Sequence, residues 1–133
     1  MAKITSITEA TFKEPANSSW PSTYEGLVVT LDNGTDAKVG IEDGQSCCEN
    51  WGHITSEDNF EDFIGAELIS VAGVDSKLDH VEVPDIYEGD IMFVNFNTSA
   101  GVLQFVAYNE HNGYYSHEAV LIVGGNLKES WSL

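Results

Sequence analysis

Short runs rich in β-branched and aromatic residues, separated by turn-forming Asn and Gly, constrain the fold of this 133-residue chain more than any other feature. Runs of this kind are typical of strands, because such side chains fit a pleated, half-buried surface. An Asp32-Asn33-Gly34 step predicts a hairpin turn between two of them. The predicted strands are residues 4–12, 27–31, 37–41, 67–74, 91–96, 102–108 and 114–123. We therefore expect one compact β-rich domain over residues 1–133, with an N-terminal strand and loop (1–25), a core (26–123) and a tail (124–133).

Residues 56–64 depart from the strand pattern. Phe60 and Phe63 recur at helical spacing, Ser56 is a suitable N-cap and Gly65 a suitable stop. The spacing predicts a short helix of about two turns.

The last three runs predict a three-stranded antiparallel meander, because short turn-forming segments join them. Gly124-Gly125 ends the meander, and the tail beyond it either docks through Trp131 or frays. The expected fold class is therefore α+β, mostly antiparallel β, as a single sheet or partly closed barrel with one short helix. The order of the strands and the closure of the barrel stay open.

The net charge of the chain limits the kinds of molecule that it can bind. The chain has 22 Asp and Glu against five Lys and no Arg, a formal net charge of −17, yet 42 % of its residues are hydrophobic, which favours a folded domain over a disordered one. A field this negative repels nucleic acid and anionic membranes and attracts basic protein surfaces. We expect a basic protein partner, with no direct binding to nucleic acid or membrane.

The expected location is the cytoplasm of a host cell. No apolar run approaches the roughly 18 residues of a membrane span, and the first residues lack the apolar region of a secretory signal. The adjacent Cys47 and Cys48 are poorly placed to bridge each other, so no disulfide framework is expected. The oligomeric state is not predicted.

Four carboxylates would share one face of the expected helix, since each helical residue turns by 100°. They are Glu57, Asp58, Glu61 and Asp62. The common interpretation of such a cluster is a solvated face on an acidic protein. The alternative is a docking stripe for a basic groove, in which closely spaced carboxylates stand in for the phosphates of a nucleic acid.

One segment combines thiol, carboxylate and imidazole groups, the ingredients of a thiol nucleophile or a zinc site. Its members are Cys47, Cys48, Glu49, Trp51 and His53. Adjacent cysteines of an extended chain point to opposite faces, so only one is suited to bind a metal, and the negative field disfavours a reactive thiolate. We expect a motif of unknown role with neither catalysis nor metal binding.

A second polar and aromatic segment lies on the expected last hairpin. His111, Tyr114, Tyr115 and His117 are residue types that line ligand pockets, and Glu118 would add a carboxylate for a divalent metal. The alternative is an ordinary hairpin with one Tyr packed inward. No cofactor is expected.

Four motifs occur in order within residues 26–123: Asp43-Gly44-Gln45, Cys47-Cys48-Glu49, the run from Phe63 to Leu68, and Asn112-Gly113-Tyr114-Tyr115-Ser116. On these motifs the chain resembles a family of small uncharacterised bacteriophage and prophage proteins. The resemblance implies a phage or mobile-element origin and no established catalytic residues.

Charge and resemblance together predict a non-enzymatic, phage-encoded counter-defence inhibitor. It would act as a nucleic-acid mimic that binds a basic host protein, such as a nuclease or CRISPR effector. One alternative is a sponge for a small nucleotide immune signal, held by Tyr114, Tyr115 and His117. A second is a hydrolase or metal-binding protein that uses Cys48, His53, His111 or His117.

Overall fold

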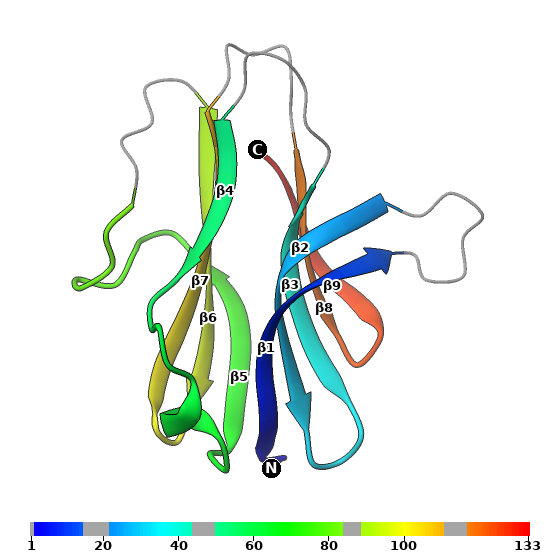
Figure 1. The fold of residues 1–133 in the computed structure, drawn as a ribbon, viewed down its shortest axis with the longest axis vertical. Helices are drawn as coiled ribbons and strands as arrows, with labels where there is room; N and C mark the ends of the chain where they lie inside the picture. The colour runs from blue at the N-terminus through cyan, green and yellow to red at the C-terminus, as the bar shows by residue number, and fades with distance from the viewer. Residues whose placement is uncertain (1, 15–21, 44–49, 84–88, 111–116) are drawn as a thin grey trace.

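The chain folds as a β-sandwich of two antiparallel sheets (Figure 1). The computed structural model describes residues 2–14, 22–43, 50–83, 89–110 and 117–133. The elements are β1 (Ile4–Glu14), β2 (Ser22–Leu31), β3 (Asp36–Glu42), β4 (Asn50–Thr55), the 3-10 helix η1 (Glu61–Phe63), β5 (Leu68–Val74), β6 (Gly89–Thr98), β7 (Gly101–Glu110), β8 (Glu118–Val123) and β9 (Asn126–Ser132).

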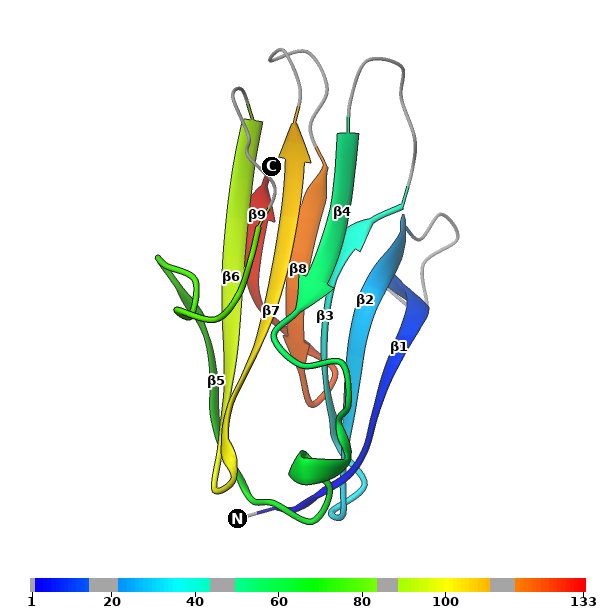
Figure 2. The ribbon, with the colours of Figure 1, turned by 60° about the vertical axis from the view of Figure 1, so that its left-hand side comes forward.

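The five-stranded sheet has the order β1-β2-β3-β8-β9, and the four-stranded sheet has the order β4-β7-β6-β5. Figures 1 and 2 show the two sheets packed face to face, with the ends of β1 and β2 bending away from the four-stranded sheet. β1 and β9 are therefore the edges of one sheet, and β4 and β5 are the edges of the other.

The core lies between the sheets and follows from alternation along the strands. Val29 and Val39 face inward from the five-stranded sheet, and Val94, Phe96 and Phe105 face inward from the other; all five are fully buried. Each sheet therefore has one face in the common core and one outer face.

The hairpin predicted around Asp32-Asn33-Gly34 is confirmed. Thr30 pairs with Asp36, Leu31 N donates to Thr35 O at 2.9 Å, and Gly34 adopts a φ of 85°. Asn33 Oδ1 also accepts the backbone N–H of Thr35 at 3.0 Å. Strands are also present where the sequence predicts them over residues 4–12 and 67–74.

The expected helix over residues 56–64 is wrong. Ser56 does not cap a helix: its N–H donates to Gln104 O at 2.8 Å, and its Oγ accepts the N–H of Gln104 at 2.9 Å. Pairing with β7 therefore extends beyond β4, and helical structure is limited to the single turn of η1. The α+β class is only loosely matched, because the described chain is mostly strand and has almost no helix.

The single sheet or partly closed barrel is also replaced by two sheets. The predicted meander stops after the β6–β7 hairpin, since β8 crosses to the other sheet and pairs with β3 and β9. Residues 119–122 of β8 are buried on both faces, which suits a central strand rather than the edge of a meander.

The tail docks as a strand. Gly124 and Gly125 both have positive φ, 60° and 81°, which is the backbone of a tight hairpin turn, and β9 follows at once. Trp131 packs against the core, and Leu133 is buried. Within the described ranges, no helix has the length and apolar character needed to cross a membrane.

Candidate functional site

The four carboxylates singled out in the sequence lie in the segment that joins β4 to β5. This segment crosses the lower end of the sandwich, where η1 lies near the N-terminus (Figure 2). It is fixed there by β1, because Ile4 N donates to Ala66 O at 2.8 Å and Gly65 N donates to Ile4 O at 2.7 Å. Phe63 anchors it to the core, with an exposed fraction of 6 %.

These carboxylates do not form one helical face, because only Glu61 and Asp62 are in η1. Asp58, Glu61 and Asp62 are exposed, and Glu57 is half-buried. Within the part of the chain that the structure describes, no Lys or His side chain lies within ion-pair distance of the three exposed carboxylates. Their charge is therefore left to solvent or to a partner.

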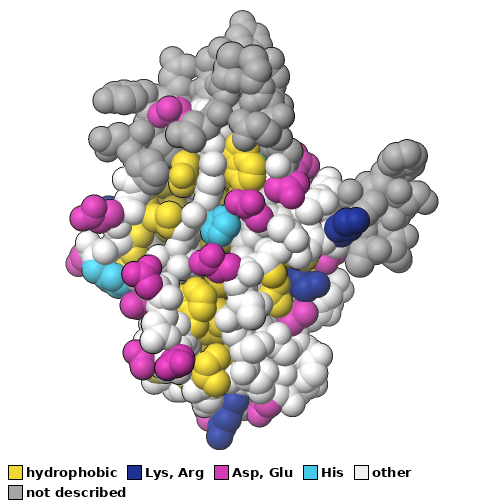
Figure 3. Space-filling view, viewed as in Figure 1, with side chains coloured by type: hydrophobic (Ala, Val, Ile, Leu, Met, Phe, Trp, Pro, Cys, Tyr) yellow, Lys and Arg dark blue, Asp and Glu magenta, His cyan; other side chains and the backbone are white. Residues whose placement is uncertain are grey.

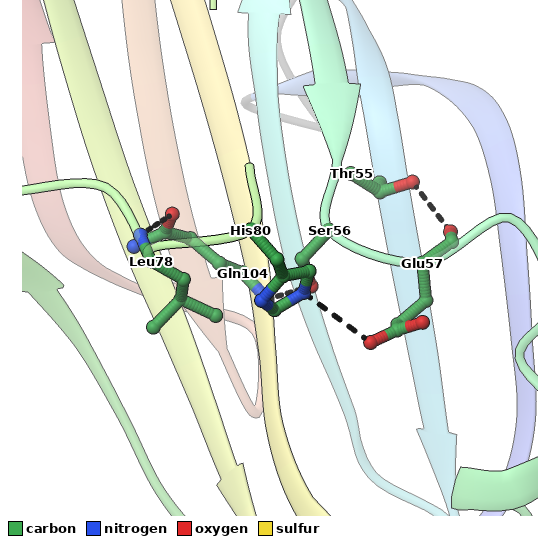
Figure 4. Close-up of polar contacts among 6 residues, drawn as sticks. All are labelled: Thr55, Ser56, Glu57, Leu78, His80 and Gln104. Atoms are coloured by element: carbon green, nitrogen blue, oxygen red, sulfur yellow. Dashed lines mark hydrogen bonds and ion pairs between the residues drawn. The ribbon is translucent and has the colours of Figure 1, made fainter. Parts of the chain in front are cut away.

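Glu57 differs from the other three. Its Oε1 lies 3.5 Å from His80 Nε2, and its carbonyl accepts the Thr55 hydroxyl at 2.9 Å (Figure 4). His80 belongs to residues 75–83, a segment that lies on the outer face of the four-stranded sheet and bonds there to the Gln104 side chain. One basic side chain therefore approaches the start of the acidic segment.

Gln104 forms hydrogen bonds with Ser56, just before the acidic segment, and with residues 75–83, and so fixes both to the four-stranded sheet. Its backbone pairs with Ser56, as described above, and its side chain points to the outer face and is fully buried. Its Nε2 donates to Ser76 O at 3.0 Å and to Asn95 Oδ1 at 2.9 Å, and its Oε1 accepts the N–H of Leu78 at 3.0 Å (Figure 4). Our sequence interpretation missed Gln104, although an amide inside the apolar run 102–108 was a usable signal.

The segment that contains Trp51 and His53 and the segment that contains His117 meet at the end of the sandwich opposite η1. The rings of Trp51 and His117 have centroids 5.0 Å apart and are tilted by 31°. His117 is 3 % exposed, and its Nδ1 donates to Glu42 O at 2.7 Å. A donated hydrogen bond to a carbonyl means that Nδ1 carries a proton, so this atom is occupied by a structural contact.

His53 connects the two sheets. Its Nδ1 lies 3.2 Å from Glu25 Oε1 on β2, and its ring stacks on Phe105 with centroids 5.4 Å apart. The remaining members of both segments lie outside the described residues: Cys47, Cys48, Glu49, His111, Tyr114 and Tyr115. The structure therefore places Trp51, His53 and His117, and it leaves the alternative of a hydrolase that uses Cys48 or His53 untested.

A groove on the outer face of the five-stranded sheet was not predicted. It has a volume of about 280 Å³ and is lined by Glu14, Tyr24, Glu118, Val120, Ile122, Gly125 and Leu127. The Tyr24 hydroxyl donates to Glu118 Oε1 at 2.6 Å, and burial together with this hydrogen bond raises the pKa of Tyr24. Phe12 stacks on Tyr24 at 5.7 Å and completes a small apolar cluster with Val120 and Ile122.

No group of three or more His, Cys, Asp or Glu side chains among the described residues is arranged to hold a metal ion. In particular, the described His117 and Glu118 are separated by strand alternation, one buried and the other exposed.

Comparison with known proteins gives a family and no activity. A family model described as a domain of unknown function matches residues 2–121. This match begins earlier than the resemblance over residues 26–123 and includes β1. Searches of curated proteins and of solved structures found no match. The chain therefore belongs to the DUF7448 family of domains of unknown function.

Proposed function

We propose that this chain is a non-enzymatic binding protein whose carboxylates occupy the basic, nucleic-acid-binding surface of another protein. The observation that carries the proposal is uncompensated negative charge. The net charge is −17, and Asp58, Glu61 and Asp62 are exposed without a cationic partner among the described residues. In Figure 3, acidic side chains are spread over the face shown and predominate over the few Lys side chains.

Charge of one sign gives such a protein a long-range attraction to a basic groove. The attraction raises the association rate and acts over about 10 Å at 0.1 M salt. Closely spaced carboxylates on a folded surface offer a basic groove what phosphates offer it, with less ordering entropy than a flexible acidic tail. The segment of residues 57–62 is suited to this role because β1 and the core hold it in place.

The biological setting is a further part of the proposal. The motif resemblance to bacteriophage and prophage proteins supports a phage-encoded inhibitor of a bacterial defence protein, such as a nuclease or a CRISPR effector. The family model adds no function to this argument. The setting therefore rests on motif resemblance and charge together.

The test compares two variants of equal net charge. The first neutralises the acidic segment by Glu57→Gln, Asp58→Asn, Glu61→Gln and Asp62→Asn. The matched control neutralises four exposed carboxylates elsewhere, by Asp75→Asn, Asp79→Asn, Glu82→Gln and Asp90→Asn. Proteins captured from the bacterial host at low salt are identified by mass spectrometry, and the purified partner is titrated with each variant.

We expect one basic nucleic-acid-binding protein at near stoichiometry, with affinity that falls as salt rises. The first variant should lose more affinity than the control, because the lost contacts are local as well as electrostatic. Equal affinity of the first variant and the unmodified protein would remove residues 57–62 from the proposal. The absence of any basic partner would remove the proposal itself.

The nucleotide-sponge and hydrolase alternatives stay predictions. The sponge needs Tyr114 and Tyr115, which lie outside the described residues, and phosphates are usually held by Arg or Lys, of which this chain has five in total. Ultraviolet-absorbing ligand released on denaturation would favour it. The hydrolase predicts loss of function when Cys48, His53, His111 or His117 is changed to Ala.

A further inference from the structure

β1 is an edge strand with an open side. It pairs with β2 from Ile4 to Glu14, and beyond Ile4 no described residue pairs with its other side. Residues 8–11 are exposed, and the strand bends away from the four-stranded sheet (Figure 1). An edge of this kind presents unpaired backbone donors and acceptors, and natural proteins usually protect it with Pro, a bulge or charged side chains. The only register irregularity of β1 lies at its start, between Ile4 and Ser6.

The register identifies which groups are open. Leu31 N donates to Thr35 O and Asp43 N donates to Thr23 O, so the odd-numbered residues of β2 bond to β3. The even-numbered residues of β2 therefore bond to β1, where their partners are also even-numbered. It follows that the N–H and C=O groups of Ile7, Glu9, Thr11 and Lys13 point away from β2.

The charge of β1 differs from that of the rest of the chain. Residues 1–14 contain Lys3, Glu9, Lys13 and Glu14, two charges of each sign, although the whole chain carries −17. Residues 1–14, which contain β1, are thus a neutral segment of a strongly acidic protein. Neither Glu9 nor Lys13 takes part in an ion pair within the described part of the chain.

We propose that β1 pairs antiparallel with β1 of a second copy of this chain, in the register that places Thr11 opposite Thr11. In that register Glu9 of each copy lies opposite Lys13 of the other, so two ion pairs form across the two-fold axis. Glu9, Thr11 and Lys13 are also the residues whose backbone groups are open. The two five-stranded sheets become one continuous sheet.

Other registers lack this complementarity. Centring the pair on Glu9 places two like charges opposite each other, and centring it on Ala10 places Glu9 opposite Thr11. A parallel pairing in register opposes like charges at both Glu9 and Lys13. Only the Thr11-centred register joins the open backbone groups and pairs every charge between residues 9 and 13.

The edges formed by β5 and β9 do not offer the same surface. Lys128 Nζ donates to Val71 O at 2.8 Å, so a β9 side chain already covers a carbonyl of β5. A Cβ built on Gly73 of β5 would lie 2.8 Å from the Trp131 ring, which shows how closely β9 packs there. The β5–β9 side is therefore closed, whereas the edge of β1 is open.

The test is the monomer–dimer equilibrium of the full chain, measured by sedimentation over a range of protein and salt concentrations. We expect dimerisation to strengthen as salt rises, because salt screens the repulsion between two acidic molecules. This direction is opposite to that expected for the basic partner of the proposed function. The two proposals therefore fail independently of each other.

Charge reversal tests the register. Glu9→Lys and Lys13→Glu should each make the protein monomeric where the unmodified chain is dimeric. Glu9→Lys also lowers the net negative charge, so an effect of net charge alone would strengthen dimerisation instead. An equimolar mixture of the two variants should form a heterodimer, because each Lys then meets a Glu. Glu82→Lys, an equal change at an exposed residue outside β1, should leave the dimer intact.

A covalent probe tests the same register in a background with Cys47 and Cys48 changed to Ser. Thr11→Cys should form an intermolecular disulfide, because directly paired residues have Cα atoms about 5.5 Å apart. Thr8→Cys, which lies far from its own copy in this register, should not. A chain that stays monomeric at every protein and salt concentration would overturn the proposal. So would charge-reversed variants that fail to associate when mixed.

Discussion

The outer faces of the two sheets are covered in different ways. On the four-stranded sheet, residues 75–83 lie over the strands and are held by the buried Gln104 amide. On the five-stranded sheet no described segment plays that part, and Phe12, Tyr24, Val120 and Ile122 form an apolar cluster beside an open groove. One face is closed by hydrogen bonds to a covering segment, and the other is closed only by its own side chains.

This difference bears on where partners can bind. A covering segment that satisfies a buried amide is costly to displace, because each separated polar group loses its partner. The apolar cluster on the five-stranded sheet is itself buried, but no described segment has to be displaced for a molecule to reach the groove beside it. The five-stranded sheet, with its groove and the open edge of β1, is therefore the more accessible of the two sheets.

Gln104→Leu is the substitution with the largest expected effect on stability, and it tests how the outer face of the four-stranded sheet is closed. The change leaves Leu78 N–H, Ser76 C=O and the Asn95 amide without their present partner. We expect the free energy of unfolding to fall by about 2–4 kcal/mol, since each buried unsatisfied group costs about 1–3 kcal/mol and water reaches some of them. Urea denaturation measures the change.

Asn97→Ala is the matched control on the same sheet. Asn97 Nδ2 donates to Ser70 Oγ at 3.0 Å in an exposed hydrogen bond, so its loss should cost well under 1 kcal/mol. Similar costs for the two changes would contradict the idea that hydrogen bonding of Gln104 holds the covering segment.

On the five-stranded sheet the corresponding test is Gly40→Ala. A Cβ at this position would lie 2.8 Å from Glu25 O and 3.0 Å from the Phe12 ring, so the backbone of β2 or the apolar cluster must shift. We expect a loss of about 1–3 kcal/mol in the free energy of unfolding, typical of overpacking. Thr8→Ala, an exposed change on β1, serves as the control.

A small loss of stability in Gly40→Ala would also distinguish the two outer faces. If Gly40→Ala costs less than about 0.5 kcal/mol, within the usual range for surface changes, the apolar cluster yields easily. The outer face of the five-stranded sheet would then be soft as well as uncovered.

Tyr24→Phe tests a hydrogen bond to a carboxylate on that face. Removing the hydroxyl deletes the contact with Glu118 and should cost about 1 kcal/mol near neutral pH. The pKa of Tyr24 is raised in the folded protein, so the native state holds this proton more tightly than the unfolded state does. Stability from this group is complete below about pH 10, the ordinary pKa of tyrosine, and falls as the pH rises above it.

The measurement is the difference in stability between the unmodified protein and Tyr24→Phe, as a function of pH. The difference should be constant up to about pH 10 and shrink above it. The other tyrosines are present in both proteins, so their titration cancels. A difference that stays constant above pH 10 would show that burial and Glu118 do not perturb Tyr24.

Local signals in the sequence predicted the local structure. The β2–β3 hairpin follows from Asp32-Asn33-Gly34, because turn residues and strand pattern are read within a few positions. The errors were long-range. Ser56 looks like an N-cap from its neighbours, but its partner is Gln104 on β7, 48 residues away. Likewise, β8 follows the β6–β7 hairpin in the chain and yet belongs between β3 and β9.

The candidate functional residues show the same contrast between local features, which were predicted, and long-range contacts, which were missed. Exposure of Asp58, Glu61 and Asp62 agrees with their residue type, but their grouping on one helical face failed with the helix itself. The contact of Trp51 with His117 joins two segments that the sequence marks separately, and no periodicity links them. The groove at Tyr24 and Glu118 was missed because its walls come from four strands and one turn.

The smallest expected effect concerns the contact between the acidic segment and the covering segment. His80 and Glu57 lie 3.5 Å apart, but their side chains are 57 % and 43 % exposed, so solvent screens the pair. His80→Gln should therefore change the free energy of unfolding by no more than about 0.5 kcal/mol. The measurement is urea denaturation beside Gln104→Leu. A cost comparable to that of Gln104→Leu would mean that charge, rather than the buried amide, holds residues 75–83 on the sheet, and the contrast between the two outer faces would have to be explained by electrostatics.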